Sequence, residues 1–452
     1  MESINPTTGE RWRVYPETSE AELREAPLAA HQAFLLWRAR TFAERAAVLR
    51  NVATLLRKRR DEFARLMALE MGKPIAQGRA EADKCAACCD FYAENAAAML
   101  SPERIVTEAT RSYVLFQPLG VILAVMPWNF PFWQVLRAAV PALMAGNTML
   151  LKHASNIPGC ALAIAELFRE AGLPSGAFRT LLIGSGRVAG LVADPLIRAI
   201  TLTGSTPAGR SVASQAGQAL KKTVLELGGS DPYVVLEDAD LESAAVICAS
   251  SRLINNGQSC IAAKRFIVVE SVRARFEELF VGHLAKQVMG DPLVERTTLG
   301  PLARVALRDE LHQQVTESVR LGARLLCGGA IPDGPGAFYP PTALADVKKG
   351  MPVYDQETFG PVAAIIGAED EAQAIAVAND TVFGLGAAVF TRDLVRGERI
   401  AAQLEAGCCF VNDFVRSDPR LPFGGVKESG YGRELSSFGL REFVNIKTVS
   451  LK

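Results

Sequence analysis

The sequence predicts an α/β fold made of two units, each a doubly wound parallel sheet, and three observations lead to this fold class. After residue 110, short β-rich runs alternate with helical stretches, which is the pattern of parallel strands covered by helices on both faces. The chain has 452 residues, a length that corresponds to two or three domains. A Leu-Gly-Gly turn at residues 227–229 divides the alternating region, so we expect one sheet before it and one after it.

Helices dominate the N-terminal hundred residues, because Ala, Leu, Glu and Arg recur there with apolar residues three or four positions apart. We expect helices at residues 20–33, 41–69 and 77–100, with a break at the Met-Gly-Lys-Pro segment 71–74.

The first α/β unit has five β-rich runs separated by helical stretches. Its expected strands are residues 112–116, 121–126, 148–152, 179–183 and 199–203, and its helices are residues 158–171 and 207–216. In the second unit we expect strands at residues 233–236, 265–269, 362–366, 387–391 and 408–411, and helices at residues 241–256 and 272–288. The last residues, 442–452, predict a strand without an obvious partner, and an unpaired strand edge can add to another subunit.

Composition excludes several classes of protein. Lys and Arg together number 49, as do Asp and Glu, so no net charge attracts nucleic acid or an anionic membrane. No apolar run reaches the ~18 residues of a membrane helix, and the N-terminal residues lack the features of a signal peptide. The nine cysteines are irregularly spaced and the four histidines are scattered, which favours reduced thiols and no metal site. We therefore expect a cytoplasmic protein that binds neither nucleic acid nor membrane.

The strongest local feature is the polar turn at residues 255–260, Asn-Asn-Gly-Gln-Ser-Cys, at the end of an expected helix. A cysteine in a polar turn can be reached and activated, and the thiolate is a strong nucleophile. Cys260 is therefore a candidate nucleophile, with a turn cysteine of no special role as the alternative.

A second feature is Glu226, which lies in an apolar strand and is followed by Gly228 and Gly229. Burial would raise its pKa toward that of a general base. The alternative is an edge-strand glutamate that faces water, but paired glycines indicate close approach of another backbone segment.

Further polar residues follow strands at the edge where α/β proteins bind ligands. Gly204 and Ser205 connect a strand to a helix whose free N–H groups suit a phosphate. Asn129 follows another strand, Lys152 ends a third, and Glu357 precedes a fourth. Taken singly, each charged residue is more often a solvated surface group.

This combination resembles the NAD(P)-dependent aldehyde dehydrogenase superfamily, over essentially the whole chain. The signatures are residues 225–229 and 257–260, with the cysteine 34 positions after the glutamate, together with the Pro-Phe-Gly-Gly segment that begins at residue 422. Residues 128–137, 152–156, 257–265 and 424–434 most resemble the short bacterial succinate-semialdehyde dehydrogenases.

The resemblance implies a catalytic role for three residues. Cys260 would attack the aldehyde carbon, Asn129 and the Cys260 backbone N–H would form the oxyanion hole, and Glu226 would activate water to hydrolyse the thioester. A cysteine-dependent esterase, or a silent binding protein with this fold, is the alternative from another class.

The resemblance also assigns a cofactor site. Lys152 and Glu357 would bind the two riboses, and Gly204 and Ser205 would meet the pyrophosphate. The aromatic residues Trp128 and Phe359 would line the site.

Cofactor choice is expected to depend on Ser155. Relatives that favour NAD often carry a glutamate there, which repels a 2′-phosphate, whereas a serine can donate to one. Lys152 is then free to pair with the phosphate. We expect NADP to be preferred, with NAD possible.

Substrate choice is expected to depend on Arg137, nine residues after Trp128, because a guanidinium suits a distal carboxylate. Ser417 could add a hydroxyl donor. Some relatives carry a second arginine where this chain has Ile254. The expected substrate is succinate semialdehyde, and glutarate semialdehyde or another small aldehyde is the alternative.

The domains implied by the resemblance are three. A cofactor-binding domain would take residues 1–103 and 125–227, and a catalytic domain residues 228–435. An oligomerisation element would take residues 104–124 and 436–452, in a homodimer or homotetramer.

Overall fold

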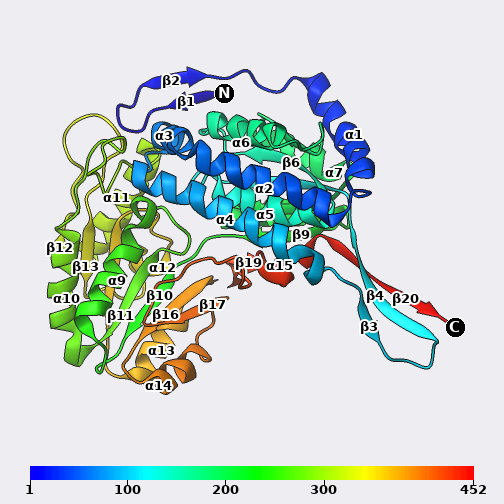
Figure 1. Ribbon diagram of the computed structural model, residues 1–452. Coiled ribbons are helices and arrows are strands. Elements are labelled where there is room, and N and C mark those ends of the chain that lie inside the picture. Colours follow the sequence, from blue (N-terminus) through cyan, green and yellow to red (C-terminus); the bar gives the residue numbers. More distant parts are fainter.

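The computed structural model describes residues 1–452, and it contains two α/β units from which a small three-stranded sheet projects (Figure 1). The fold class predicted from the sequence, two doubly wound parallel sheets with a small additional β element, is confirmed.

The first sheet has the spatial order β19-β9-β8-β5-β6-β7, and all neighbours in it are parallel except β19 and β9. Its strands are β5 (Val121–Met126), β6 (Thr148–His153), β7 (Phe178–Thr180), β8 (Ile197–Thr203), β9 (Lys222–Glu226) and β19 (Gly430–Tyr431). The chain runs outward from β5 to β7, then returns and runs outward from β8 to β9. The strand order therefore reverses between β5 and β8, which is where such sheets bind ligands.

Both faces of this sheet are covered, because successive residues of a strand point to opposite faces. Ile122 and Ala124 of β5 belong to the core shared with one group of helices, and Val121 and Leu123 to the core shared with another. The first group is α2 (Phe42–Lys58), α3 (Arg60–Met71), α4 (Ile75–Met99), α5 (Trp133–Ala145) and α6 (Pro158–Glu170). The second group is α1 (Glu20–Trp37), α7 (Val188–Ala193) and α8 (Thr206–Gln218).

The second sheet has the order β12-β13-β14-β11-β10-β16-β17, with β12 alone antiparallel to its neighbour. Its strands are β10 (Asp231–Val235), β11 (Ala263–Val269), β12 (Arg324–Cys327), β13 (Thr342–Ala345), β14 (Val362–Ala368), β16 (Gly386–Phe390) and β17 (Cys408–Val411). One face packs on α9 (Leu241–Leu253) and α10 (Glu270–Leu284). The other packs on α11 (Val305–Arg320), α12 (Pro352–Asp355), α13 (Glu371–Asn379) and α14 (Leu394–Ala401).

The projecting sheet joins the end of the chain to a distant segment. Its order is β20-β4-β3, made of β3 (Glu103–Ile105), β4 (Arg111–Pro118) and β20 (Val444–Leu451), and β20 pairs antiparallel with the whole of β4. The last strand thus has a partner in its own chain, which local sequence did not identify, and its other edge is unpaired. Residues 121–124, which the family resemblance assigned to this element, belong instead to β5, as the strand pattern predicted, because their side chains are buried in the first sheet.

Smaller elements complete the fold. They are a hairpin of β1 (Glu2–Ile4) and β2 (Arg11–Val14), a pair of β15 (Phe383–Gly384) and β18 (Val426–Lys427), and α15 (Ser436–Glu442). The expected helix at residues 41–69 is two helices, because Arg59 leaves helical geometry with φ −105° and ψ 16°. No glycine or proline marks this break in the sequence.

Candidate active site

The turn before Cys260 is fixed by backbone conformation and by side-chain hydrogen bonds. The expected helix at residues 241–256 ends at Leu253, because Asn255 and Asn256 adopt left-handed conformations with φ of 54° and 58°. Asparagine tolerates this conformation better than most residues. The Asn255 amide donates to the carbonyl oxygen of Asn129 at 2.7 Å, so the cysteine turn is joined to the segment after β5.

Cys260 lies in a cavity of ≈410 Å³ at the point where the strand order of the first sheet reverses. The segment after β5 and the segment after β8 both line this cavity, as the position of the switch point predicts. The cavity brings together seven residues singled out in the sequence: Trp128, Asn129, Gly204, Ser205, Cys260, Glu357 and Phe359.

The side chain of Asn129 supplies a hydrogen-bond donor beside the cysteine turn. It is 4% exposed, and its amide nitrogen donates to the carbonyl oxygen of Gln258 at 3.1 Å. An amide group has two N–H donors, so the second is available to an oxyanion in the cavity.

Glu226 ends β9 as a buried carboxyl group, 2% exposed, and neither of its oxygens has a hydrogen-bond partner. Burial raises its pKa to about 8, although the nearby charge of Arg137 acts in the opposite direction. The glycines after it permit close packing: a Cβ on Gly229 would lie 2.5 Å from the carbonyl oxygen of Cys260. The segment that follows the glutamate's strand therefore packs against the cysteine turn, as the paired glycines indicated.

A buried lysine that the sequence reading missed lies under the same turn. Lys264, at the start of β11, donates to the carbonyl oxygens of Ser259 at 2.9 Å and Cys260 at 2.8 Å. Its ammonium is 3.6 Å from Glu357, which also accepts a 3.0 Å hydrogen bond from the backbone N–H of Gly229. A lysine four residues after the cysteine, inside an apolar strand, is the signal that could have identified it.

The ionisation of the thiol reflects two opposing effects. Burial raises the pKa of Cys260 to about 12, whereas the positive charges of Arg137 and Lys264 lower it. The surrounding cations therefore favour the thiolate within an environment that otherwise disfavours it.

The remaining walls of the cavity fit a dinucleotide. The rings of Trp128 and Phe359 meet edge to face with centroids 5.7 Å apart. Ser205 caps the start of α8 without a side-chain capping bond, so the first N–H groups of the helix are free for a phosphate. These groups provide an aromatic wall and an anion site at one switch point.

Lys152 and Ser155 lie at the carboxyl end of β6 but do not line the 410 Å³ cavity. Lys152 is 9% exposed and makes no ion pair or hydrogen bond through its ammonium, and burial lowers its pKa. Ser155 is exposed in the turn before α6. An unpartnered, largely buried ammonium fits a site for an anionic or hydroxyl-bearing ligand.

The two residues predicted to bind the substrate carboxylate do not line this cavity. Arg137 on α5 is 2% exposed, forms an ion pair with Glu434 and lies over the ring of Phe423 at 4.9 Å. Ser417 accepts a 2.8 Å hydrogen bond from the ammonium of Lys84. Glu434, which the sequence reading did not single out, thus satisfies the charge of Arg137.

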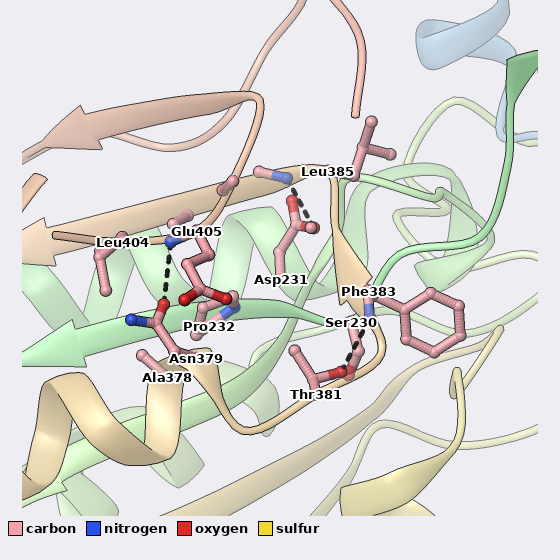
Figure 2. A pocket seen from close by; sticks show the side chains of 14 residues that line it. Ser230, Asp231, Pro232, Ala378, Asn379, Thr381, Phe383, Leu385, Leu404 and Glu405 are labelled. Carbon is pink, nitrogen blue, oxygen red and sulfur yellow. Dashed lines mark hydrogen bonds between the residues drawn. The ribbon is translucent and has the colours of Figure 1, made fainter. Parts of the chain in front are cut away.

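A small cavity elsewhere contains none of the predicted residues (Figure 2). Its volume is ≈10 Å³, which is about the room that one water molecule needs. The buried carboxyl group of Asp231 accepts a 3.1 Å hydrogen bond from Gly386, and burial raises its pKa to about 7. This site is too small for an organic substrate.

No group of three or more His, Cys, Asp or Glu side chains is arranged to hold a metal ion. None of the helices combines the length and the apolar composition needed to cross a membrane.

Comparison with known proteins gives consistent matches over the whole chain. The Aldehyde dehydrogenase family matches residues 1–449. The chain is 52% identical over 447 residues to a probable NADP(+) succinate-semialdehyde dehydrogenase of Synechocystis sp., covering 99% of this chain and 98% of that protein. It is 50% identical over 447 residues to an NAD(P)+ succinate semialdehyde dehydrogenase of Escherichia coli, covering 99% and 97%.

A solved structure also resembles the chain over its whole length. The succinic semialdehyde dehydrogenase of Streptococcus pyogenes in complex with NADP+ matches with a TM-score of 0.97 and 40% identity, covering 100% of this chain and 99% of that chain.

Proposed function

Because the chain belongs to the aldehyde dehydrogenase family, we propose that it oxidises succinate semialdehyde to succinate, with NADP as the preferred cofactor and NAD as an alternative. The observation that carries the reaction class is the placement of Cys260 and Asn129 in one cavity at the switch point. The buried Glu226 ends β9, the strand next to β8. The substrate and cofactor follow from relatives that are about half identical and carry those names.

The first half of the reaction uses Cys260 as the nucleophile. Its sulfur attacks the aldehyde carbon, and the oxyanion accepts hydrogen bonds from the Asn129 amide and the Cys260 backbone N–H. The cationic surroundings of the thiol, including Lys264, stabilise the thiolate that this step consumes. When bound, the oxidised nicotinamide supplies the acceptor for the hydride that leaves the substrate carbon, so that a thioester remains on Cys260.

The second half hydrolyses the thioester. Glu226 accepts a proton from water as the water attacks the acyl carbon, and the carboxylic acid is released. Its two unpartnered oxygens leave acceptor sites for that water, and a pKa of about 8 suits a general base near neutral pH.

Cofactor binding would use residues from both halves of the first sheet and one residue of the second unit. Gly204 and Ser205 would hold the pyrophosphate at the start of α8, and Glu357 would accept from a ribose hydroxyl. Lys152 and Ser155, at the end of β6, would bind the adenosine ribose and its 2′-phosphate.

The remaining parts of the proposal concern domains, assembly and compartment. The projecting sheet, with the unpaired edge of β20, supports its role as an oligomerisation element in a homodimer or homotetramer. The two α/β units would serve as cofactor-binding and catalytic domains, and the protein would act in the cytoplasm.

Steady-state kinetics tests the proposed function. Succinate semialdehyde, glutarate semialdehyde and butanal are each supplied with NADP and with NAD, and reduced cofactor is followed by absorbance. The highest kcat/KM should belong to succinate semialdehyde with NADP. Ester hydrolysis without any reduction of cofactor would instead indicate a cysteine-dependent esterase.

A further inference from the structure

A second cavity has a volume of ≈540 Å³, and one of its lining residues directly follows two that line the cavity of Cys260. Trp128 and Asn129 line the cavity that contains Cys260, and the next residue, Phe130, lines the second cavity. Apolar side chains form much of its wall, among them Phe130, Trp133, Ile254 and Phe414. Its size is within the range of small-molecule sites.

The cationic group in this cavity is the ammonium of Lys84, on α4. It donates to the hydroxyl of Ser417 at 2.8 Å and lies 4.2 Å from the centre of the Trp133 ring. No carboxylate forms an ion pair with it. A lysine that is partly buried without a counter-ion is uncommon, and it marks a place where an anion can be bound.

The acidic residues of the same cavity are already neutralised by other partners. Glu81 forms an ion pair with Lys73, and it accepts hydrogen bonds from two backbone N–H groups at the start of α5. Glu295 forms an ion pair with Arg79. Neither carboxylate therefore serves as the counter-ion of Lys84.

The ammonium also lies in an unfavourable electrostatic environment. Burial, and to a smaller extent the nearby positive charge of Arg137, lower the pKa of Lys84 to about 8. Arg137 has Glu434 as its counter-ion, whereas Lys84 has none. A bound carboxylate would favour the charged ammonium, and would so oppose the effects of burial and of the Arg137 charge.

We propose that Lys84 is a specificity-determining residue that binds the carboxylate at the far end of the substrate, with Ser417 as a second donor. The apolar wall would hold the short methylene chain, and the aldehyde end would point toward Cys260. This inference rests on the proposed function. It means that the carboxylate of the substrate binds a residue that does not line the cavity of Cys260.

The test is Lys84→Met, assayed with succinate semialdehyde and with butanal, which has the same number of carbon atoms and no charge. Removing one charge-assisted contact should lower kcat/KM for succinate semialdehyde by about 10- to 100-fold. The value for butanal should stay nearly constant, since the catalytic residues are untouched. Lys58→Met, at an exposed position of α2, is the matched control and should change neither value.

The outcomes distinguish a wrong substrate from a wrong role of Lys84. A wild-type protein that oxidises both aldehydes equally well would overturn the proposed substrate. A wild-type preference for succinate semialdehyde that survives Lys84→Met, or an equal loss on both aldehydes, would overturn the role of Lys84. If Lys84→Met does not fold, Lys84→Gln keeps a polar partner for Ser417 without the charge, and the same comparison applies.

Discussion

The ammonium of Lys264 donates a 2.8 Å hydrogen bond to the carbonyl oxygen of Cys260 and lies 3.6 Å from the carboxylate of Glu357. One buried cation therefore connects the turn that carries the nucleophile to the residue expected to bind a ribose. Its charge also lowers the pKa of the thiol, which burial raises. Turn geometry and thiol ionisation are thus coupled through a single side chain.

Cys260→Ala should abolish aldehyde oxidation, because no other thiol lines the catalytic cavity. Binding of NADP should persist, since the groups expected to hold it are unchanged. Activity is measured as reduction of NADP, and cofactor binding by calorimetry. Substantial turnover by this variant would show that Cys260 is not the nucleophile.

Glu226→Gln should separate the two halves of the reaction. The first turnover should still release reduced cofactor as a burst, whereas steady-state turnover should fall by about 10²–10⁴-fold, the usual contribution of a general base. Stopped-flow absorbance records both phases. Loss of the burst would mean that Glu226 acts before thioester formation.

The pH dependence of steady-state turnover should report the raised pKa of Glu226. The base is active only as the carboxylate, and burial raises its pKa to about 8, so the protonated, inactive form prevails below that pH. Turnover limited by hydrolysis should therefore rise with pH and level off above about 8. A profile that is already flat from pH 5 upward would contradict the raised pKa.

Arg137→Met should destabilise the protein, because it leaves Glu434 buried without a counter-ion. The expected cost is about 3–5 kcal/mol in the free energy of unfolding. The double variant Arg137→Met with Glu434→Gln, which removes both charges, should recover part of this loss. Unchanged stability with a loss confined to succinate semialdehyde would instead support direct contact of Arg137 with the substrate.

Ser155→Glu should reverse the cofactor preference from NADP toward NAD. The new carboxylate would repel the 2′-phosphate and could accept hydrogen bonds from the ribose of NAD. The measurement is kcat/KM for each cofactor in the wild type and the variant. A variant with the same preference as the wild type would locate selectivity elsewhere.

Local sequence pattern identified most strands of both sheets, because alternation and β-branched composition depend only on near neighbours. It also placed Asn129, Gly204 and Cys260 at turns, where glycine and polar residues set the backbone. It failed at Arg59, where two helices meet without a glycine or proline, and at the β1–β2 hairpin.

By itself, then, the sequence determined the fold class, and it predicted the nucleophile, the base and seven of the residues that line the cavity around Cys260. Only the tertiary structure decided how the buried charges are paired: Arg137 with Glu434, Lys264 with Glu357, and Lys84 with the hydroxyl of Ser417. The last two residues are 333 positions apart. The energy of a buried charge depends on its partners across such distances, and local periodicity does not encode them.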